Sequence, residues 1–425
     1  MTAYSPRIVV VGAGLAGLRA AERLRELGFD GELVIIGEES RAPYHRPALS
    51  KQFLLGGQRA PELALRSYVE LDAQWRLDTR VRGLNPARRV LELPGGEDFA
   101  YDGLVIATGV QARHPEGAPI HDPRVSSLRT VEDAVSVQRA LNASDQPVVV
   151  LGGGFLATEL AATLREFGRD VSVVSRSPVL LSHVLGRTLG ATVGRMHEAR
   201  GVSVELSTQV RNWVPKDSGI GVHLSTGKIV VAGCVVLAVG SVPVVDWLRG
   251  SGLDITDGVR CGPTCHVDGA EDVVAAGDVA RWPNLRFDRT PRRVEQWLNG
   301  VEMGRAAAES LLAGRSSAVP FRPLPRFWSE QYGVRFQAAG LPALGERTVR
   351  LSGDPERGRG VVGYHSQGEL LAVVGRDSPR KVLQWTSVLN RGQPLGIRQR
   401  IEVRERSRTE DRDSRHRAAT AVLSP

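Results

Sequence analysis

The stretch Arg7-Ile8-Val9-Val10-Val11-Gly12-Ala13-Gly14-Leu15-Ala16-Gly17 decides the fold of this 425-residue chain. An apolar strand, suited to a buried parallel sheet, leads directly into three glycines at the spacing of a dinucleotide-binding turn. Gly12 lets the chain turn tightly, Gly14 lets the backbone approach a pyrophosphate, and Gly17 lets the next helix pack against the strand. The stretch therefore predicts a strand–turn–helix unit whose helix N-terminus binds the phosphates of a dinucleotide.

The residues that follow complete a βαβ unit. Apolar residues recur at helical spacing up to about Leu27, Gly28 ends the helix, and residues 32–36 form the next strand. Glu38 comes just after that strand, where a carboxylate would bind the ribose hydroxyls of the nucleotide. Glu39 is adjacent and remains the alternative.

The same unit occurs a second time further along the chain. Residues 147–151 form the strand, Gly152-Gly153-Gly154-Phe155-Leu156-Ala157 the turn, 158–167 the helix and 171–174 the following strand. Ala157 replaces the third glycine, a replacement that still allows close packing of helix and strand. Two copies of one nucleotide-binding unit predict an α/β fold with two Rossmann-like domains.

The two units differ at the end of their second strands. The second unit has Ser175-Arg176-Ser177 where the first has two glutamates. A guanidinium can pair with a phosphate dianion, and a carboxylate that would bind a free 2′-hydroxyl is missing here. The second site is therefore expected to prefer NADPH to NADH. The alternative is that Arg176 is an ordinary surface residue.

Further strands and domain boundaries follow from short apolar runs. Runs at 104–109, 235–240 and 273–278 end in small residues, as buried strands do at a ligand crevice, and 302–313 is expected to form a helix that Gly314 ends. We expect a discontinuous first nucleotide domain, a second one, a small C-terminal α+β interface domain, and a disordered charged tail. Their boundaries are 1–115 with 246–319, then 116–245, 320–395 and 396–425.

Composition excludes several classes of protein. The net charge is +8, and the three cysteines, Cys234, Cys261 and Cys265, form neither a disulfide framework nor a metal-binding pattern. No run of the sequence approaches the length of a membrane span, no signal peptide is visible, and no nucleic-acid module is recognisable. We therefore expect a cytoplasmic protein without a metal site.

Several further motifs, in order, resemble those of the FAD-dependent ferredoxin reductases that serve cytochromes P450 and ring-hydroxylating dioxygenases. They are Pro43-Tyr44-His45-Arg46-Pro47-Ala48-Leu49-Ser50-Lys51, Ala107-Thr108-Gly109, Gly277-Asp278, Val294-Glu295-Gln296-Trp297 and Phe327-Trp328-Ser329-Glu330-Gln331-Tyr332. The resemblance assigns FAD to the first glycine turn and NAD(P)H to the second.

The resemblance also implies roles for individual residues. Lys51 would lie beside the flavin and pair with Glu159 near the nicotinamide, Arg46 would contact an FAD phosphate, and Asp278 would accept hydrogen bonds from the ribityl chain. The expected FAD positions are Gly12, Gly14, Leu15, Ala16, Gly17, Glu38, Arg46, Lys51, Ala107, Thr108, Gly109, Gly277, Asp278, Glu295, Gln296, Trp297 and Trp328. The expected NAD(P)H positions are Gly152, Gly154, Phe155, Leu156, Ala157, Glu159, Ser175, Arg176 and Gly240.

Two positions and one segment depart from the family pattern. Gln296 stands where relatives often carry His, Val244 replaces a usual Asn, and residues 374–379 are less typical. These departures concern the choice of partner and the fine geometry of the cofactor rather than the flavin site itself.

The function implied by the resemblance is transfer of a hydride from NAD(P)H to FAD, followed by single-electron transfer to a [2Fe–2S] ferredoxin. Arg176 favours NADPH as the donor, and the net charge of +8 favours a ferredoxin with an acidic surface. The protein would act as a monomer or homodimer. A flavin disulfide reductase would need a redox cysteine near the flavin, and no cysteine precedes Cys234. A nucleotide-sensing flavoprotein with little turnover, or a flavin oxidoreductase acting on a small molecule, remain alternatives.

Overall fold

The structure is a computed structural model that describes residues 5–391. These residues form two compact units. The first consists of 5–182, 190–327 and 331–333, and the second of 183–189, 328–330 and 334–391. The predicted tail, 396–425, lies outside the described residues.

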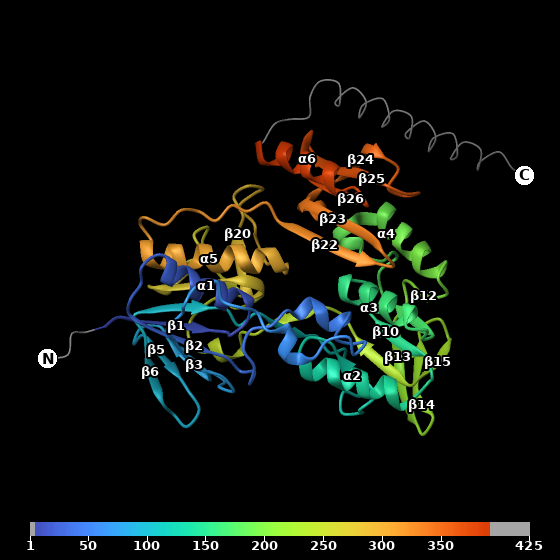
Figure 1. Cartoon of the computed structure of the whole chain (residues 1–425), viewed down its shortest axis with the longest axis horizontal. Coiled ribbons are helices and arrows are strands. Elements are labelled where there is room, and N and C mark those ends of the chain that lie inside the picture. Colours follow the sequence, from blue (N-terminus) through green and yellow to red (C-terminus); the bar gives the residue numbers. More distant parts are fainter. Residues whose placement is uncertain (1–4, 392–425) are drawn as a thin grey trace, which may run out of the picture. The chain divides into compact units, whose positions relative to one another are not determined.

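The first glycine turn belongs to a five-stranded parallel sheet. Its strand order is β19 (Val273–Ala275), β7 (Gly103–Ile106), β1 (Arg7–Val11), β2 (Glu32–Ile36) and β3 (Ala73–Arg76). Helices α1 (Leu15–Glu26) and α5 (Trp297–Ala313) lie side by side against this sheet, as Figure 1 shows. The predicted βαβ unit is present, with its strands and helix within about one residue of the expected bounds.

The second glycine turn belongs to a sheet of the same kind. Its order is β12 (Ser203–Glu205), β11 (Val171–Val174), β10 (Val148–Leu151), β16 (Cys234–Leu237) and β9 (Val125–Ser127), and the neighbouring strands pair in parallel. Helices α2 (Val131–Ala143), α3 (Phe155–Glu166) and α4 (Ser182–Glu198) accompany it. The fold-class prediction of two Rossmann-like domains is therefore confirmed.

Short sheets and single 3₁₀ turns complete the first unit. The antiparallel sheets are β4 (Gly83–Asn85), β5 (Val90–Glu92) and β6 (Asp98–Ala100), and β13 (Val210–Lys216), β14 (Gly219–Leu224) and β15 (Ile229–Ala232). Smaller pairings join β8 (Val110–Ala112) to β17 (Ser241–Pro243), and β20 (Ala280–Pro283) to β18 (Val259–Arg260) and β21 (Pro291–Arg292). The 3₁₀ turns are η1 (Arg46–Ser50), η2 (Ala60–Leu63), η3 (Asp246–Leu248) and η4 (Gly277–Val279).

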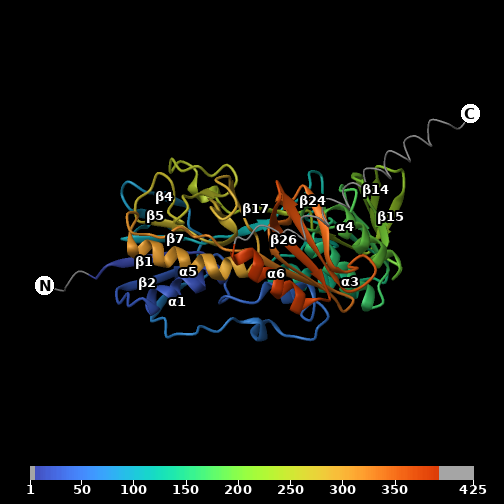
Figure 2. The ribbon, with the colours of Figure 1, turned by 90° about the horizontal axis from the view of Figure 1, so that it is seen from above.

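The second unit is built on an antiparallel sheet, as the predicted α+β interface domain requires. The strand order is β22 (Arg326–Gln331), β23 (Val334–Gly340), β26 (Glu369–Arg376), β25 (Gly360–Ser366) and β24 (Arg347–Gly353). Helix α6 (Pro379–Arg391) packs on β23 and β26 (Figure 2), and the short turn η5 (Pro342–Leu344) follows β23. The buried Val382 of α6 faces Gly375 of β26, where a side chain would find no room.

Two helices begin earlier in the structure than the sequence predicted. Helix α3 starts at Phe155 rather than 158, because Gly154 already takes the extended conformation of an N-cap. Helix α5 starts at Trp297 rather than 302, after the extended Gln296, and it ends at Gly314 as expected. The earlier start places Trp297 in the first turn of α5.

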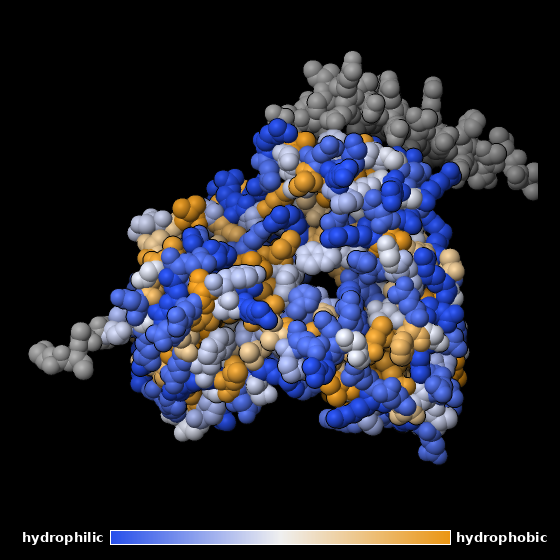
Figure 3. All heavy atoms as spheres, in the orientation of Figure 1, coloured by the Kyte–Doolittle hydropathy of each residue, from blue (hydrophilic) through white to orange (hydrophobic). Residues whose placement is uncertain are grey.

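In the described part of the chain, no helix is long and apolar enough to cross a membrane. On the face in Figure 3, hydrophilic side chains are interspersed with hydrophobic ones. The core lies under this surface, in the strands of the two parallel sheets. Val9, Val10, Val149 and Val150 are completely buried.

The close packing of α1 on α5 leads to a prediction about Gly304. A methyl group there would clash with the carbonyl oxygen of Ala16 and lie 3.2 Å from Cβ of Arg19. We expect Gly304→Ala to destabilise the protein by about 1–3 kcal/mol, the usual cost of overpacking. The measurement is thermal unfolding followed by circular dichroism.

Gly194→Ala is the matched control, because a methyl group at this position of α4 would meet no atom of the described chain within 4 Å. Replacing a helical glycine by alanine then stabilises by up to about 1 kcal/mol. Equal destabilisation by both changes would contradict the packing argument.

Candidate functional site

The first glycine turn is closed tightly by the neighbouring strand. Gly12 has φ +117°, and a side chain there would collide with the carbonyl of Ala107 at the end of β7. A side chain at Gly17 would collide with the carbonyl of Gly12. Around Gly14, by contrast, the described chain leaves open space beside the N-terminus of α1. Backbone N–H groups and the partial positive charge of the helix are therefore accessible to a phosphate. Leu15 and Ala16 form the first turn of that helix.

Two buried polar atoms near this turn show that the residues fit a polar cofactor such as FAD. Nε of Arg129 and Oε1 of Gln296 are buried, and neither has a hydrogen-bond partner within residues 5–391. A buried polar atom without a partner costs free energy that a bound ligand can recover. The guanidinium would donate to an oxygen of the cofactor, and the amide oxygen would accept from one of its N–H or O–H groups.

Arg129 is the residue of this site that the sequence analysis missed. Its guanidinium donates to Oδ2 of Asp278 over 3.2 Å, although 149 residues separate the two. Thr130 is the N-cap of α2. Its hydroxyl oxygen accepts a hydrogen bond from the Asp133 backbone N–H, and its own backbone N–H donates to the Asp133 carboxylate. That reciprocal capping pattern can be recognised in a sequence, and it would have placed Arg129 at the start of a helix.

Asp278 lies where the prediction put it, after the strand end of β19. Burial raises the pKa of its carboxyl group above the ordinary value, and the Arg129 guanidinium opposes that shift. Gly277, with φ +75°, is packed so closely on Ala16 that a side chain would meet its Cβ at 2.8 Å. Asp278 is thereby held beside the first turn of α1, a position suited to accepting hydrogen bonds from sugar-like hydroxyls.

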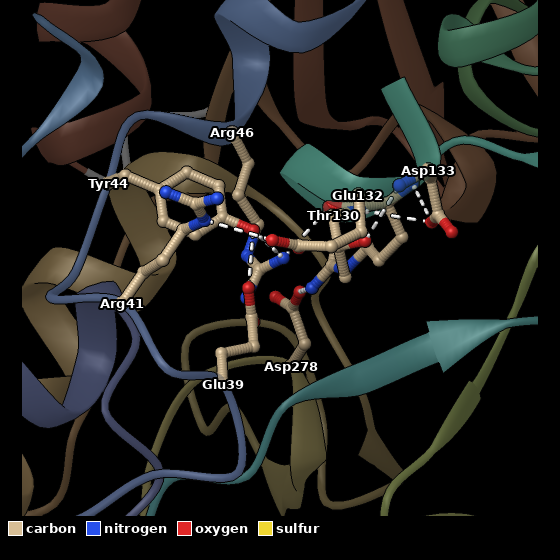
Figure 4. Close-up of polar contacts among 9 residues, drawn as sticks. Glu39, Arg41, Tyr44, Arg46, Thr130, Glu132, Asp133 and Asp278 are labelled. Atoms are coloured by element: carbon tan, nitrogen blue, oxygen red, sulfur yellow. Dashed lines mark hydrogen bonds and ion pairs between the residues drawn. The ribbon is translucent and has the colours of Figure 1, made fainter. Parts of the chain in front are cut away.

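Arg46 lies in a polar cluster, shown in Figure 4, that joins the segment after β2 to the start of α2. It pairs with Glu39 and donates to the hydroxyl of Tyr44 over 2.9 Å and to the carbonyl of Arg129 over 2.8 Å. Arg41 pairs with Glu132 in the same cluster. These contacts hold Arg46 next to Arg129; its contact with an FAD phosphate stays a prediction.

The two glutamates after β2 have different surroundings. Glu39 is engaged by Arg46 and by the Tyr44 hydroxyl, which donates to it over 2.6 Å. Glu38 is more exposed, and its carboxylate lies 3.6 Å from Arg80. Since Glu39 already has strong partners, Glu38 is the less engaged of the two carboxylates; its contact with a ribose stays a prediction.

The remaining expected FAD positions surround the start of α5 and the end of β7. Trp297 contacts the ring of His45 edge-on, with centroids 4.8 Å apart. Glu295 accepts hydrogen bonds from Arg293 and Ser241, each over 2.5 Å. The Thr108 hydroxyl donates to the carbonyl of Val244 over 2.8 Å. Ala107 and Gly109 flank Thr108. Trp328 belongs to the second unit, and its proximity to flavin stays a prediction.

The second glycine turn repeats the geometry of the first. Gly152 has φ +132°, and a side chain there would collide with the carbonyl of Ala238 at the end of β16. Around Gly154 the described chain again leaves open space. Ala157 is completely buried between helix and strand. Phe155 packs on Phe327 with ring centroids 4.9 Å apart, and Leu156 follows it in the first turn of α3.

The end of β11 carries the residues expected to read the nucleotide's 2′ position. Ser175 is buried, its backbone N–H bonds the carbonyl of Glu205, and Arg176 is exposed. The carboxylate of Glu205 is itself paired with Lys228 over 2.6 Å. Gly240, with φ +104°, lies at an exposed position after β16.

An ion pair brings the two glycine-turn domains together. Nζ of Lys51 lies 2.5 Å from Oε2 of Glu159, and it also donates to the Pro47 carbonyl over 3.3 Å and to the Ser50 hydroxyl over 3.4 Å. Lys51 ends η1 of the first domain, and Glu159 is on α3 of the second. Both side chains are mostly buried, at 28% and 13% exposure. The predicted pair is present.

The three cysteines are buried free thiols. Burial raises the pKa of Cys234 and of Cys265 to about 12 and that of Cys261 well above its ordinary value. None of these thiols would ionise near neutral pH, so none is a nucleophile.

Comparisons with known proteins match the whole of this architecture. The pyridine nucleotide-disulphide oxidoreductase family matches residues 6–304, and the reductase C-terminal family matches residues 326–404. The anthranilate 1,2-dioxygenase system ferredoxin–NAD(+) reductase component of Burkholderia cepacia is 35% identical over 379 residues, which covers 87% of this chain and 91% of that protein. Rhodocoxin reductase of Rhodococcus erythropolis is 32% identical over 398 residues, covering 91% and 90%.

Solved structures agree with these sequence matches. The covalent putidaredoxin reductase–putidaredoxin complex aligns with a TM-score of 0.85 at 28% identity, covering 92% of this chain and 94% of that one. The ferredoxin reductase of Rhodopseudomonas palustris aligns with a TM-score of 0.81 at 27% identity, covering 87% and 91%.

The Lys51–Glu159 pair leads to a prediction for the reduction of bound flavin. Lys51→Ala should slow it by about tenfold to a thousandfold in stopped-flow experiments, because a positive charge is lost where negative charge arrives. FAD content should stay unchanged, since the glycine turn and Asp278 are intact. Lys216→Ala, at the exposed end of β13, is the control and should behave as wild type. Unaltered kinetics in Lys51→Ala would refute this placement of the lysine.

Proposed function

The chain belongs to the pyridine nucleotide-disulphide oxidoreductase family, and we propose that it uses FAD to carry electrons from NADPH to a [2Fe–2S] ferredoxin that serves an oxygenase. The family predicted from the sequence, the ferredoxin reductases, is the one that the comparisons find. The nucleotide preference, the identity of the partner and the roles of single residues are the proposed part.

The observation that carries this function is the ion pair between Lys51 and Glu159. Each residue belongs to a different glycine-turn domain, so their contact joins the two dinucleotide sites at one point. When bound, FAD supplies the chemistry that accepts two electrons together and gives them up singly. The chain's own residues bind and orient: the two turns hold the pyrophosphates, and the Lys51 ammonium, fixed by Glu159, keeps a positive charge beside the reacting rings.

Support for a protein partner comes from the relatives and from charge. The relatives named above are reductase components of an oxygenase system or redoxin reductases, and the solved complex contains putidaredoxin. The net charge of +8 favours encounter with an acidic protein. The buried cysteines count against a disulfide reductase, because that chemistry needs a thiolate near the flavin.

Support for NADPH comes from the residues after β11. The sequence 175–177 contains no acid, and the carboxylate of Glu205, at the end of the neighbouring strand β12, is paired with Lys228. The exposed Arg176 can therefore bind a 2′-phosphate without competing repulsion. In this respect the chain would differ from the relatives that are named NAD(+) reductases. Cytoplasmic location and a monomeric or homodimeric state belong to the same proposal.

The proposed activity is tested by anaerobic addition of NADPH to the yellow protein, followed by steady-state reduction of cytochrome c with and without a [2Fe–2S] ferredoxin. We expect bleaching of the flavin absorbance and a rate of cytochrome c reduction that rises at least tenfold with ferredoxin. Bleaching without any acceleration by ferredoxin would favour the nucleotide sensor. Rapid reoxidation by a small quinone alone would favour the small-molecule oxidoreductase.

The nucleotide preference is tested with Arg176→Glu. Loss of a charge-assisted contact worth about 1.5–3 kcal/mol should raise KM for NADPH by about tenfold to a hundredfold and leave KM for NADH within about twofold. Arg139→Glu, an exposed residue of α2, makes the same charge change elsewhere on the second domain and should alter neither constant. Equal increases for both nucleotides in Arg176→Glu would refute the phosphate contact.

A further inference from the structure

A series of side-chain hydrogen bonds leads from Tyr332 to the second glycine turn. The Tyr332 hydroxyl lies 2.9 Å from Nδ1 of His197, and Nε2 of His197 lies 3.0 Å from Oε1 of Gln331. Nε2 of Gln331 donates to Oγ1 of Thr158 over 2.9 Å. The Thr158 hydroxyl lies 3.1 Å from the carbonyls of Gly154 and of Phe155, both in the first turn of α3 or at its N-cap. All these residues belong to the first unit.

The hydrogen bonds of this series all donate in the same direction, from Tyr332 towards the turn. Burial lowers the pKa of His197, so its ring is neutral at pH 7, with one nitrogen donating and one accepting. Because the Gln331 amide must present its N–H to Thr158, its oxygen faces His197, and Nε2 of His197 carries the hydrogen. Nδ1 then accepts from Tyr332. Each intermediate group both accepts and donates, which is the arrangement in which such bonds strengthen one another.

The middle of this series of hydrogen bonds is closed to water. His197 and Thr158 are completely buried, and Gln331 is 1% exposed. A water molecule therefore cannot take the place of a group that is removed, and the loss of a buried hydrogen bond costs free energy. Tyr332, at the other end of the series, is held by two ring contacts. Arg200 lies over the Tyr332 ring, 4.3 Å from its centroid, and the His197 ring meets it edge-on with centroids 5.1 Å apart.

The inner end of the series acts on the residues that face the nucleotide. Gly154 is the N-cap of α3, and its carbonyl accepts the backbone N–H of Thr158. The Thr158 hydroxyl is within hydrogen-bond distance of the Gly154 and Phe155 carbonyls. The residue after Thr158, Glu159, holds Lys51 over 2.5 Å. A shift of the first turn of α3 would therefore move the phosphate-binding N–H groups and the catalytic carboxylate together.

A second contact supports the same turn from the same strand. Phe327 and Gln331 both lie on the buried face of β22, and the Phe327 ring packs on Phe155. Phe155 is the first residue of α3 and Thr158 the fourth. The strand thus contacts both ends of the helix's first turn, with one apolar and one polar contact.

We propose that Tyr332, His197 and Gln331 are positioning residues that hold Thr158, and through it the turn Gly154–Glu159, in the geometry that binds the nicotinamide dinucleotide. This inference rests on the proposed function, which assigns that nucleotide to the second turn. It adds residues that are not among the expected FAD and NAD(P)H positions. A purely structural role would lower stability without changing nucleotide affinity.

The test is isothermal titration of the FAD-loaded protein with NADP⁺ and NAD⁺. Thr158→Val keeps the shape of the side chain but removes the hydroxyl, and it should weaken nucleotide binding about fivefold, which at 1.4 kcal/mol per tenfold corresponds to about 1 kcal/mol. Thr158→Ser restores the hydroxyl and should bind within about twofold of wild type. FAD content, read from the absorbance spectrum, should be unchanged in both variants.

Thr163→Val is the matched control, because Thr163 is also buried on α3 but lies beyond the first turn. It should bind nucleotide as wild type does. Equal weakening by Thr158→Val and Thr163→Val, or less than twofold weakening by Thr158→Val, would overturn the inference.

A double-mutant cycle tests whether Gln331 and Thr158 act through their shared hydrogen bond. Gln331→Leu should weaken binding by a similar factor, and the combination with Thr158→Val should be no worse than either change alone, since both break the same link. Independent, multiplying effects would overturn that link. Tyr332→Phe changes only the outer end and should weaken binding about twofold to threefold, which keeps the test available if an inner variant does not fold. No binding of either nucleotide to the wild-type protein would instead refute the proposed function.

Discussion

Both nucleotide sites depend on one steric constraint: each strand-to-helix turn is pressed against the end of a neighbouring strand. The first glycine of each turn has a positive φ angle and faces a carbonyl, that of Ala107 for Gly12 and that of Ala238 for Gly152. A side chain at either position would push the turn away from β7 or β16. The close approach brings the helix N-terminus to the edge of the sheet, where the carboxyl ends of the parallel strands create a crevice. The rest of each site is built around that edge.

The two crevices become one site through a contact that neither domain could make alone. Lys51 follows a turn of the first domain, Glu159 is the fifth residue of helix α3 in the second, and their pairing is mostly shielded from water. Ion pairs at an exposed surface contribute little, because solvent screens them and the side chains lose freedom. Here the pair joins the end of η1 in the first domain to the N-terminal part of α3 in the second. Its value lies in orientation, since it links the positions of two dinucleotides to each other.

The sequence predicted the features that local spacing encodes, and missed those that depend on distant partners. The glycine turns, the strands beside them and the two-domain fold follow from short-range patterns, and the fold class was confirmed. The contact of Arg129 with Asp278 spans 149 residues, so no window of the sequence contains it. The starts of α3 and α5 were placed too late because the sequence analysis treated their first turns as ligand-binding segments only. His197 was missed for a related reason: a lone histidine on an apolar helix face carries no signal until the fold brings Gln331 beside it.

The residues that surround the two turns differ in charge, and that difference matches what each site must do. Near the first turn lie the salt bridges between Arg46 and Glu39 and between Arg129 and Asp278, and such charge-assisted contacts suit a cofactor that stays bound. Near the second turn lies a neutral series of hydrogen bonds from Tyr332 to Thr158. A nucleotide that arrives and leaves in every cycle changes the charge of its crevice each time. Ion pairs buried next to the nucleotide would gain and lose electrostatic interactions each time it binds and leaves. A series of hydrogen bonds between neutral side chains keeps its bonds whether or not the phosphates are present. The second turn can therefore stay preorganised through the cycle, which lowers the ordering cost of each binding event.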